Sequence, residues 1–143
     1  MKRNHNFFSN LAFNIADSNV GKTNKNPSVG CVIVKNNSVI SSGVTSINGR
    51  PHAEYNAIKS CKYNLKDAKM YVSLEPCTHY GKTPPCSNFI IKSKIKEVIF
   101  NKNFKGQNKV TIKKFEKKQK KTKSPLHIIQ LTKNKIIRTA NFL

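Results

Sequence analysis

Acidic residues are scarce in this sequence, and long hydrophobic runs are absent. The 143 residues include 27 Lys and Arg but 6 Asp and Glu, which gives a formal net charge of +21. No stretch approaches the ~18 consecutive apolar residues that a membrane-spanning helix requires. The charged N-terminus is followed by a segment that Ser9, Asn10 and Asn14 interrupt, unlike the apolar core of a signal peptide. We therefore expect no membrane segment and a cytoplasmic location.

The length allows one domain of ordinary size and no second one. Hydrophobic residues make up 37% of the chain, and a domain of this length buries roughly two-thirds of its unfolded surface. Such a core needs no disulfide bond to stabilise it. In a reducing compartment the four cysteines, Cys31, Cys61, Cys77 and Cys86, are expected to be thiols or metal ligands.

Arginine is rare among the basic residues, of which 24 are Lys and 3 are Arg. A net charge this positive is typical of proteins that bind nucleic acid or anionic lipid. However, Arg is the side chain that most often reads bases, and the joint abundance of Lys, Asn and Ile indicates AT-rich codons. The net charge is +9 in residues 1–100 and +12 in residues 101–143. Nucleic acid is thus the less favoured partner, although the positive charge of the C-terminal segment leaves nucleic-acid binding as an alternative.

Hydrophobic periodicity predicts an α/β domain that opens with a β-hairpin. The expected elements are, in chain order, a helix over 7–16, strands at 29–34 and 38–44, a helix over 52–62, a strand at 70–74, a helix over 86–91, and strands at 98–100 and 126–131. A lysine-rich helix over 110–123 is possible, and 133–143 receives no assignment. Residues 1–100 are expected to form the core, and residues 101–143 to complete the same domain.

Three side chains suited to zinc lie in separate segments of the sequence: His52, Cys77 and Cys86. Zinc favours imidazole and thiolate ligands, and three protein ligands leave the fourth tetrahedral position for water, as in catalytic sites. His52 opens a predicted helix, and both cysteines lie between a strand and a helix, where positive helix ends favour thiolate. We predict one zinc ion per chain.

Glu54 follows His52 by two residues and is the candidate catalytic residue. At this spacing its carboxylate can face the open metal position without binding the ion, and it can take a proton from water there and return it elsewhere. Zinc deaminases combine an H-x-E segment with P-C-x-x-C. Here the cysteines are nine positions apart, so the sequence meets that signature in part.

A purely structural interpretation of these residues stays open. A lone His-x-Glu occurs by chance, and the site would then be a buried histidine with two inert thiols. Cys31 and Cys61 fall on apolar faces of predicted elements, so we expect them to be core thiols rather than ligands.

The longest match to a known family lies at residues 74–86, LEPCTHYGKTPPC. This segment resembles the deaminase domain of the bifunctional riboflavin-biosynthesis deaminase–reductases, within the cytidine deaminase-like superfamily. Residues 26–34 (NPSVGCVIV) and 51–54 (PHAE) are similar to the same family in the same order. The resemblance covers about 93 of the 143 residues, from Phe8 to Phe100.

The resemblance implies a three-layer α/β/α sandwich around a mixed central sheet. It also implies hydrolytic deamination of 2,5-diamino-6-(5-phosphoribosylamino)pyrimidin-4(3H)-one to 5-amino-6-(5-phosphoribosylamino)uracil. By the family pattern His52, Cys77 and Cys86 bind zinc, and Glu54 carries protons between water and substrate.

Substrate contacts and partners are implied as well. Asn26, in the loop before the first strand, would contact the pyrimidine, and His79 and Lys82 would contact the ribose phosphate. An imidazole and an ammonium group suit a dianionic phosphate. A small phosphoribosyl-pyrimidine is thus the expected ligand, with a homo-oligomer and a separate reductase chain as the expected assemblies.

Two segments depart from the family pattern. Thr45 stands where the family usually has a His seven residues before the zinc-binding His, so a substrate contact or orienting group is expected to be altered. Residues 101–105 (NKNFK) do not match the Asp-Pro-Asn-Pro segment of the family, and residues 101–143 show no resemblance.

Two other functions fit parts of the sequence. A nucleobase, nucleic-acid or tRNA deaminase would use the same zinc chemistry, but a tRNA deaminase would have a short Cys-x-x-Cys loop without His79 and Lys82. A catalytically degenerate zinc domain could bind RNA through residues 113–123, where 7 of 11 residues are Lys. Glu54 argues against this second alternative, because a structural zinc site needs no carboxylate there.

Overall fold

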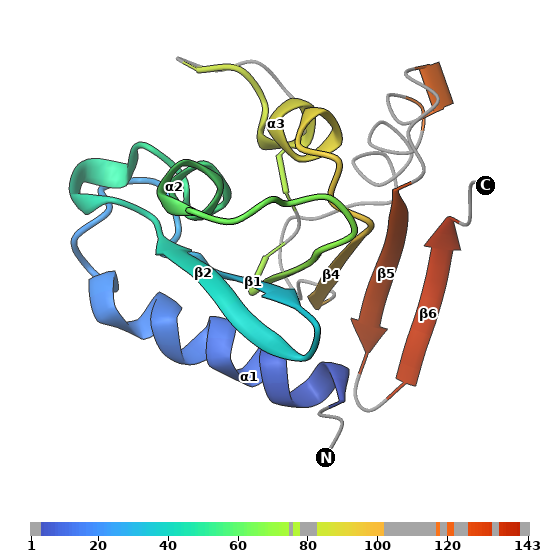
Figure 1. Ribbon diagram of the computed structural model, residues 1–143. Coiled ribbons are helices and arrows are strands. Elements are labelled where there is room, and N and C mark those ends of the chain that lie inside the picture. Colours follow the sequence, from blue (N-terminus) through green and yellow to red (C-terminus); the bar gives the residue numbers. More distant parts are fainter. Residues whose placement is uncertain are drawn as a thin grey trace.

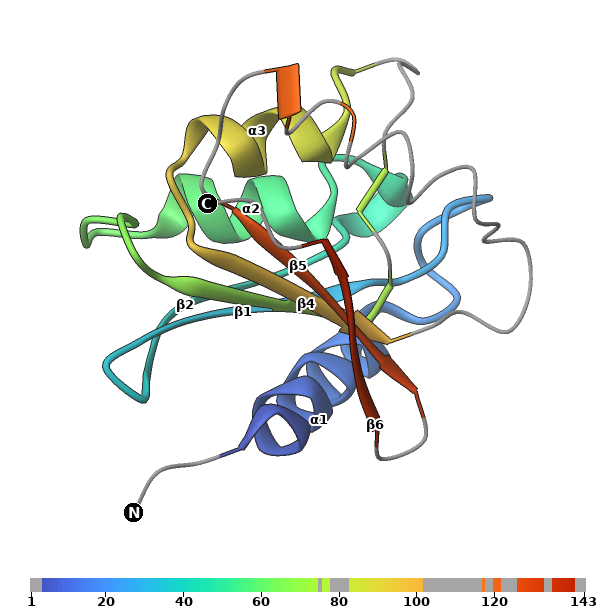
Figure 2. The ribbon, with the colours of Figure 1, turned by 90° about the vertical axis from the view of Figure 1, so that its right-hand side faces the viewer.

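A central sheet lies between two layers of helices (Figure 1, Figure 2). The computed structural model describes residues 4–74, 76–77, 83–101, 117, 120–121, 126–132 and 135–140. The helices are α1 (His5–Ala16), which covers one face of the sheet, and α2 (Ala53–Ser60) and α3 (Cys86–Lys92), which cover the other. Two short 3-10 helices are η1 (Asp17–Asn19) and η2 (Ile47–Gly49). This is the three-layer arrangement that the family resemblance implied.

Six strands form the sheet in the order β2-β1-β3-β4-β5-β6. β1 is antiparallel to both β2 and β3, whereas β3, β4 and β5 are parallel and β6 is antiparallel to β5. The sheet is therefore mixed, as expected. The strands are β1 (Gly30–Lys35), β2 (Ser38–Val44), β3 (Lys69–Val72), β4 (Glu97–Asn101), β5 (His127–Thr132) and β6 (Lys135–Ala140).

Two asparagines make the turn between β1 and β2. Asn36 and Asn37 have φ angles of 52° and 63°, the left-handed conformation that a two-residue type I′ turn requires at both positions. Asn adopts this conformation more readily than most residues. Lys35 consequently pairs directly with Ser38, and the hairpin predicted from the sequence is confirmed.

Strand β1 contributes to two hydrophobic cores, because successive residues of a strand face opposite sides of the sheet. Cys31 and Ile33 are fully buried in the core beneath α2 and α3. Val32 and Val34 are buried on the other face, in the core beneath α1. The uninterrupted apolar run at 29–34 is therefore explained by a strand that is covered on both faces, as predicted.

Helix α2 lies directly against β2 at Gly43. A Cβ atom at this position would lie 2.6 Å from the backbone nitrogen of Ala57. Two hydrogen bonds join the same elements: the Ser41 hydroxyl donates to the Ala57 carbonyl at 2.6 Å, and Asn56 Nδ2 donates to the Val44 carbonyl at 2.9 Å. Gly43 thus permits the close approach of β2 and α2.

The sequence predicted each of the α-helices and strands to within two residues at either end, with one exception, and it did not predict the two 3-10 helices. The predicted helix over 52–62 is too long, because Cys61 is already extended (ψ 126°) and α2 ends at Ser60. Strand β6 is the exception: it lies in 133–143, to which no element was assigned, and it extends the same sheet as β5. The possible helix over 110–123 falls largely outside the described residues.

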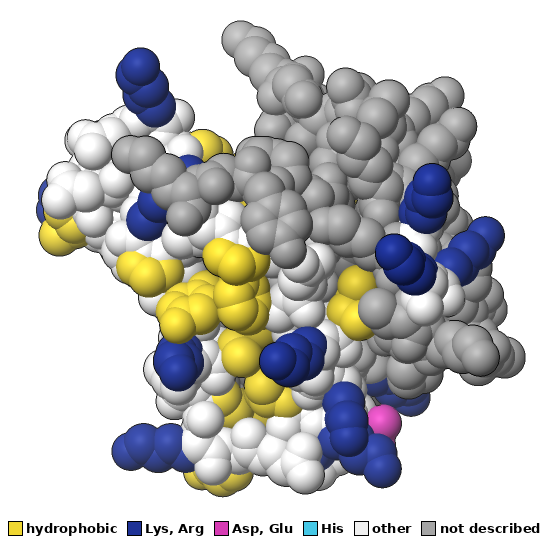
Figure 3. Space-filling model, turned by 90° about the horizontal axis from the view of Figure 1, so that it is seen from above, with side chains coloured by type: hydrophobic (Ala, Val, Ile, Leu, Met, Phe, Trp, Pro, Cys, Tyr) yellow, Lys and Arg dark blue, Asp and Glu magenta, His cyan; other side chains and the backbone are white. Residues whose placement is uncertain are grey.

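On the face shown in Figure 3, the Lys and Arg side chains of the described residues lie at several separate places. In the part of the chain that the structure describes, no helix has both the length and the apolar character needed to cross a membrane.

Candidate active site

His52 lies where the loop after β2 enters α2. It is the N-cap residue of that helix, with an extended backbone (φ −73°, ψ 162°), and its carbonyl accepts a hydrogen bond from the backbone N–H of Asn56 at 3.1 Å. The side chain is partly buried. The start of α2 therefore fixes the position of the imidazole, as the sequence predicted.

Cys77 and Cys86 approach the same point from the other side of the site. Cys86 is the first residue of α3 and directly follows Pro85, which is extended; a helix start tolerates proline. The Cys86 backbone N–H donates to the Cys77 sulfur at 3.2 Å, and the Ser87 N–H donates to the Cys77 carbonyl at 3.1 Å. The first turn of α3 thus holds Cys77 in place and offers a donor to its thiolate.

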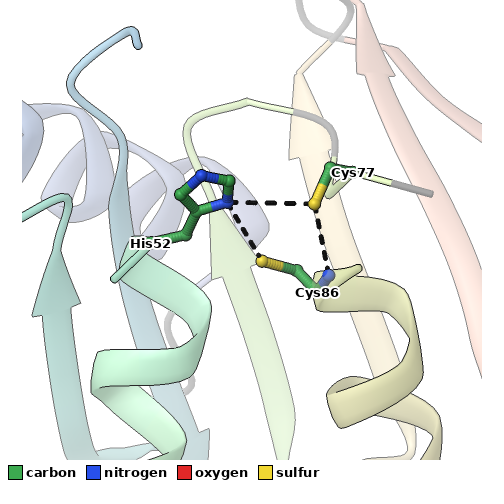
Figure 4. A group of neighbouring side chains, drawn as sticks. All are labelled: His52, Cys77 and Cys86. Carbon is green, nitrogen blue, oxygen red and sulfur yellow. Dashed lines mark hydrogen bonds between the residues drawn. The ribbon is translucent and has the colours of Figure 1, made fainter. Parts of the chain in front are cut away.

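The three side chains point toward one another (Figure 4). His52 Nδ1 lies 3.4 Å from Cys86 Sγ and 3.8 Å from Cys77 Sγ, and all three ligand atoms lie within 4.8 Å of one another. Tetrahedral zinc, with Zn–S near 2.3 Å and Zn–N near 2.0 Å, requires N···S separations of about 3.6 Å. This donor set and the two N···S distances therefore fit a zinc ion.

Hydrogen bonds give the two thiols opposite acidities. The bond from the Cys86 thiol, followed by one from His52, lowers the pKa of Cys77 to about 4, against the effect of burial. The same thiol–thiol bond and burial raise the pKa of Cys86. The pKa of His52 is raised, chiefly by its hydrogen bond to Cys77. The three side chains are therefore coupled by hydrogen bonds, and metal binding would require Cys86 to lose its proton.

Glu54 is buried next to this group. Its side chain is 3% exposed and lies in the first turn of α2. Burial is the largest influence on its pKa and raises it, whereas a hydrogen bond with Cys86 and the charge of His52 act in the opposite direction. A carboxyl group with a raised pKa can both accept and release a proton near neutral pH.

Asparagine side chains hold the loop that leads from β2 to His52. Four of them each donate to a backbone carbonyl of this loop, and we call them the asparagine clamp. They are Asn19 to Thr45 (2.9 Å), Asn24 to Asn48 (3.4 Å), Asn26 to Gly49 (2.8 Å) and Asn56 to Pro51 (3.3 Å). The clamp fixes residues 45–51 by contacts from η1, from the loop between η1 and β1, and from α2.

Asn26, the predicted pyrimidine contact, belongs to this clamp. Because its Nδ2 donates to Gly49, its Oδ1 is the atom left to accept a hydrogen bond from a ligand. The sequence did not indicate that this amide also supports the loop before His52. Its contact with substrate stays a prediction.

Thr45 is a structural residue in this fold. Its side chain is 1% exposed, and its hydroxyl oxygen accepts the backbone N–H of Val29 at 2.9 Å. The hydroxyl is thus engaged at the start of β1. Where the family usually has a histidine, this chain has a side chain that supports the backbone.

The remaining candidates have different outcomes. His79 and Lys82 lie outside the described residues, so their roles stay predictions. Cys31 is fully buried, as expected of a core thiol. The same expectation is wrong for Cys61, which is partly exposed after the end of α2, with its sulfur 3.5 Å from the Tyr63 carbonyl.

Two residues that sequence reasoning missed lie next to the predicted ligands. Arg50 Nη1 donates to Thr83 Oγ1 at 3.0 Å, which connects the segment before His52 to the segment before Cys86. The sequence offered one weak signal, the rarity of Arg among the basic residues.

Curated relatives match 61–66% of this chain. RibD from Actinobacillus pleuropneumoniae is 49% identical over 87 residues, which are 61% of this chain and 23% of that protein. Diaminohydroxyphosphoribosylamino-pyrimidine deaminase from Buchnera aphidicola (subspecies Acyrthosiphon pisum) is 42% identical over 95 residues, 66% of this chain and 65% of that protein. The chain spans 22–26% of the length of the RibD and PYRD relatives.

A solved structure extends the similarity. The deaminase/reductase from Thermotoga maritima, named for diaminohydroxyphosphoribosylaminopyrimidine and 5-amino-6-(5-phosphoribosylamino)uracil, has a TM-score of 0.74 at 33% identity. The match covers 88% of this chain and 36% of that one. A match over 88% of the chain is longer than residues 1–100. The structural similarity therefore includes part of residues 101–143, where the sequence showed no resemblance.

A family model identifies the chain more broadly. The model described as the cytidine and deoxycytidylate deaminase zinc-binding region matches residues 2–102. This range includes the three metal-ligand candidates and Glu54, and it agrees with a zinc cofactor. The chain belongs to the cytidine and deoxycytidylate deaminase zinc-binding family.

Proposed function

We propose that this protein catalyses the hydrolytic deamination of 2,5-diamino-6-(5-phosphoribosylamino)pyrimidin-4(3H)-one to 5-amino-6-(5-phosphoribosylamino)uracil and ammonia. The observation that supports this most directly is a buried carboxyl group, Glu54, beside a His-Cys-Cys group spaced for zinc. The choice of substrate is supported by relatives that are named diaminohydroxyphosphoribosylamino-pyrimidine deaminase or RibD.

His52, Cys77 and Cys86 would hold the zinc ion. When bound, zinc lowers the pKa of a coordinated water and so supplies a nucleophile at neutral pH. The chain's part is to keep the three ligands in place: the N-cap of α2 positions His52, and the first turn of α3 holds both cysteines. Three protein ligands would leave a coordination position for water on such an ion.

Glu54 would move the protons of the reaction. Its carboxylate would take a proton from the attacking water and deliver it to a ring nitrogen. It would then take the proton of the hydroxyl group formed on the ring carbon and pass it to the amino group, which leaves as ammonia while that carbon becomes a carbonyl. Burial raises the pKa of Glu54, which lets one group serve both as base and as acid. The burial also keeps bulk water from exchanging the proton between these steps.

Substrate contacts complete the proposal. Asn26 Oδ1 would accept a hydrogen bond from the pyrimidine, while His79 and Lys82 would bind the phosphate. Residues 101–143 would complete the same domain, which is supported by β5 and β6 as part of the one sheet. The cytoplasmic location, the homo-oligomer and the separate reductase stay predictions.

The test is deamination by purified, zinc-loaded protein. Ammonia release from the phosphoribosyl diaminopyrimidine is expected, with cytidine, deoxycytidylate and a tRNA anticodon hairpin as comparison substrates. Turnover of the tRNA hairpin, with the steep loss at high salt that phosphate contacts cause, would instead identify a tRNA deaminase. Specific RNA binding with no turnover of any substrate would identify a degenerate zinc domain.

A further inference from the structure

Arg50 lies at the edge of the proposed active site. It is two residues before His52 and belongs to the loop that the asparagine clamp holds, so its backbone has a fixed position. Its side chain is partly exposed. The guanidinium group reaches across to the other ligand-bearing segment, where Nη1 donates to the exposed Thr83 at 3.0 Å. Thr83 is three residues before Cys86 and directly follows Lys82 in the sequence.

The contact leaves several hydrogen-bond donors for a ligand. A guanidinium group has five N–H donors, and Thr83 uses one of them. The Thr83 hydroxyl accepts that bond, so its own proton can be donated elsewhere. Two donor groups therefore meet here, one from the segment before His52 and one from the segment before Cys86.

The charge of Arg50 has no carboxylate partner among the described residues, where the one ion pair joins Lys69 to Glu97. A guanidinium group is planar and can bind two phosphate oxygens side by side, which an ammonium group cannot do. Arg50 is also one of 3 Arg in a chain with 24 Lys.

We propose that Arg50 binds the phosphate of the phosphoribosyl substrate, with Thr83 holding the guanidinium group in place. The inference rests on the proposed function and adds a residue of the His52 segment to the phosphate contacts expected from the Cys77–Cys86 segment. Thr45 cannot supply this contact, because its hydroxyl is engaged with Val29. The phosphate would then be bound between the two segments that carry the metal ligands.

The test compares the phosphorylated substrate with its dephosphorylated riboside. Arg50→Gln should lower kcat/KM for the phosphorylated substrate by about 10- to 100-fold, through KM, since a charge-assisted hydrogen bond is lost. The riboside should change by less than about threefold. Arg50→Lys should recover part of the loss in kcat/KM. Thr83→Val should also lower kcat/KM for the phosphorylated substrate, but by less than Arg50→Gln does. Lys66→Gln, which removes the same charge from a remote exposed position, should leave both substrates unchanged.

A binding measurement separates this inference from the proposed function. Calorimetric titration of the zinc-loaded protein with ribose 5-phosphate should show binding to wild type and to Lys66→Gln, and at least tenfold weaker binding to Arg50→Gln. If that result holds while the diaminopyrimidine is not deaminated, the proposed function is wrong and the phosphate contact stands. Equal losses on both substrates would show that the Arg50–Thr83 bond is merely structural. Unchanged ribose 5-phosphate affinity in Arg50→Gln, or no binding to wild type, would likewise overturn the inference.

Discussion

At the scale of single residues, burial and hydrogen bonding set the chemistry of the site. Glu54 is 3% exposed, so desolvation raises its pKa, whereas Cys77 accepts hydrogen bonds from a thiol, an imidazole and a backbone N–H, and its pKa falls to about 4. The sequence predicted that His52, Cys77 and Cys86 form one metal site, because their side chains are typical zinc ligands. Proline and hydrophobic periodicity also placed His52 and Cys86 at the starts of helices. The sequence could not predict these acidities, which depend on burial and on hydrogen bonds between residues 9 to 34 positions apart.

Glu54→Gln should retain zinc and lose nearly all turnover. The amide keeps the size of the carboxylate but cannot accept a proton from water. A general base contributes about 10²–10⁴-fold, and Glu54 would serve more than one transfer, so we expect a loss at or beyond the upper end of that range. Steady-state ammonia release and metal analysis of the same samples check this. A variant with more than about a tenth of the wild-type rate would remove Glu54 from the proton path.

In the metal-free protein, Cys77 should react with an alkylating agent faster than Cys86 and Cys31 do. With a folded-state pKa of about 4, it is a thiolate at pH 6, whereas the raised pKa values of Cys86 and Cys31 keep both protonated. Iodoacetamide at pH 6 should therefore modify Cys77 before Cys86 and Cys31, as read by peptide mass spectrometry. Saturating zinc should abolish this preference. Equal labelling of Cys77 and Cys86 would contradict the assignment.

At the scale of elements, the site depends on how closely α2 approaches β2. The strand and the helix are each evident in the sequence, but their separation is set by Gly43, whose lack of a side chain lets the two backbones meet. The asparagine clamp could not be predicted from the sequence either. The sequence does not distinguish an Asn that donates to a backbone carbonyl from an Asn that faces solvent. The elements were thus predictable, and the contacts that place His52 within 4 Å of both sulfur atoms were not.

Gly43→Ala should destabilise the fold and weaken the zinc site together. The added methyl group would meet the backbone of α2 near Ala57, and backbone cannot rotate out of the way as a side chain can. Overpacking typically costs about 1–3 kcal/mol, and displacement of α2 should also raise the zinc dissociation constant. Thermal unfolding with and without zinc measures both effects. Ser42→Ala, at the exposed neighbouring position, is the control and should change neither.

At the scale of the whole molecule, the sheet has a hydrophobic core on each face, and the two cores have different roles. The core beneath α1 contains no site residue, whereas the core beneath α2 and α3 includes Cys31 and Ala53 and supports the metal-ligand group. Hydrophobic periodicity predicted an α/β domain that opens with a hairpin, and the family resemblance implied the three layers and the mixed sheet. Strand β6 did not, because its adjacent apolar residues Ile136 and Ile137 break the alternation that marks a half-buried strand.

Zinc removal should lower the stability of the entire domain. The ion would link α2, α3 and the segment after β3, and a ligand at 100 times its dissociation constant contributes about 2.7 kcal/mol. For a domain of this size we expect a decrease in Tm of about 10 °C when a chelator is added. Differential scanning fluorimetry checks this. The Cys77→Ala, Cys86→Ala double variant should show no response to chelator, and a wild-type Tm insensitive to chelator would argue against a structural contribution of the metal.

The close seating of α2 on β2 has a consequence for local unfolding. β2 is an edge strand that supplies no metal ligand, yet Ser41, Gly43 and Val44 are tied to the helix that follows His52. β2 should therefore be unable to separate from the sheet without disturbing His52. Zinc should then slow amide hydrogen exchange throughout β2, while β6, the edge strand at the far side, keeps its rate. The strand most exposed to fraying would be protected by an ion that it never touches.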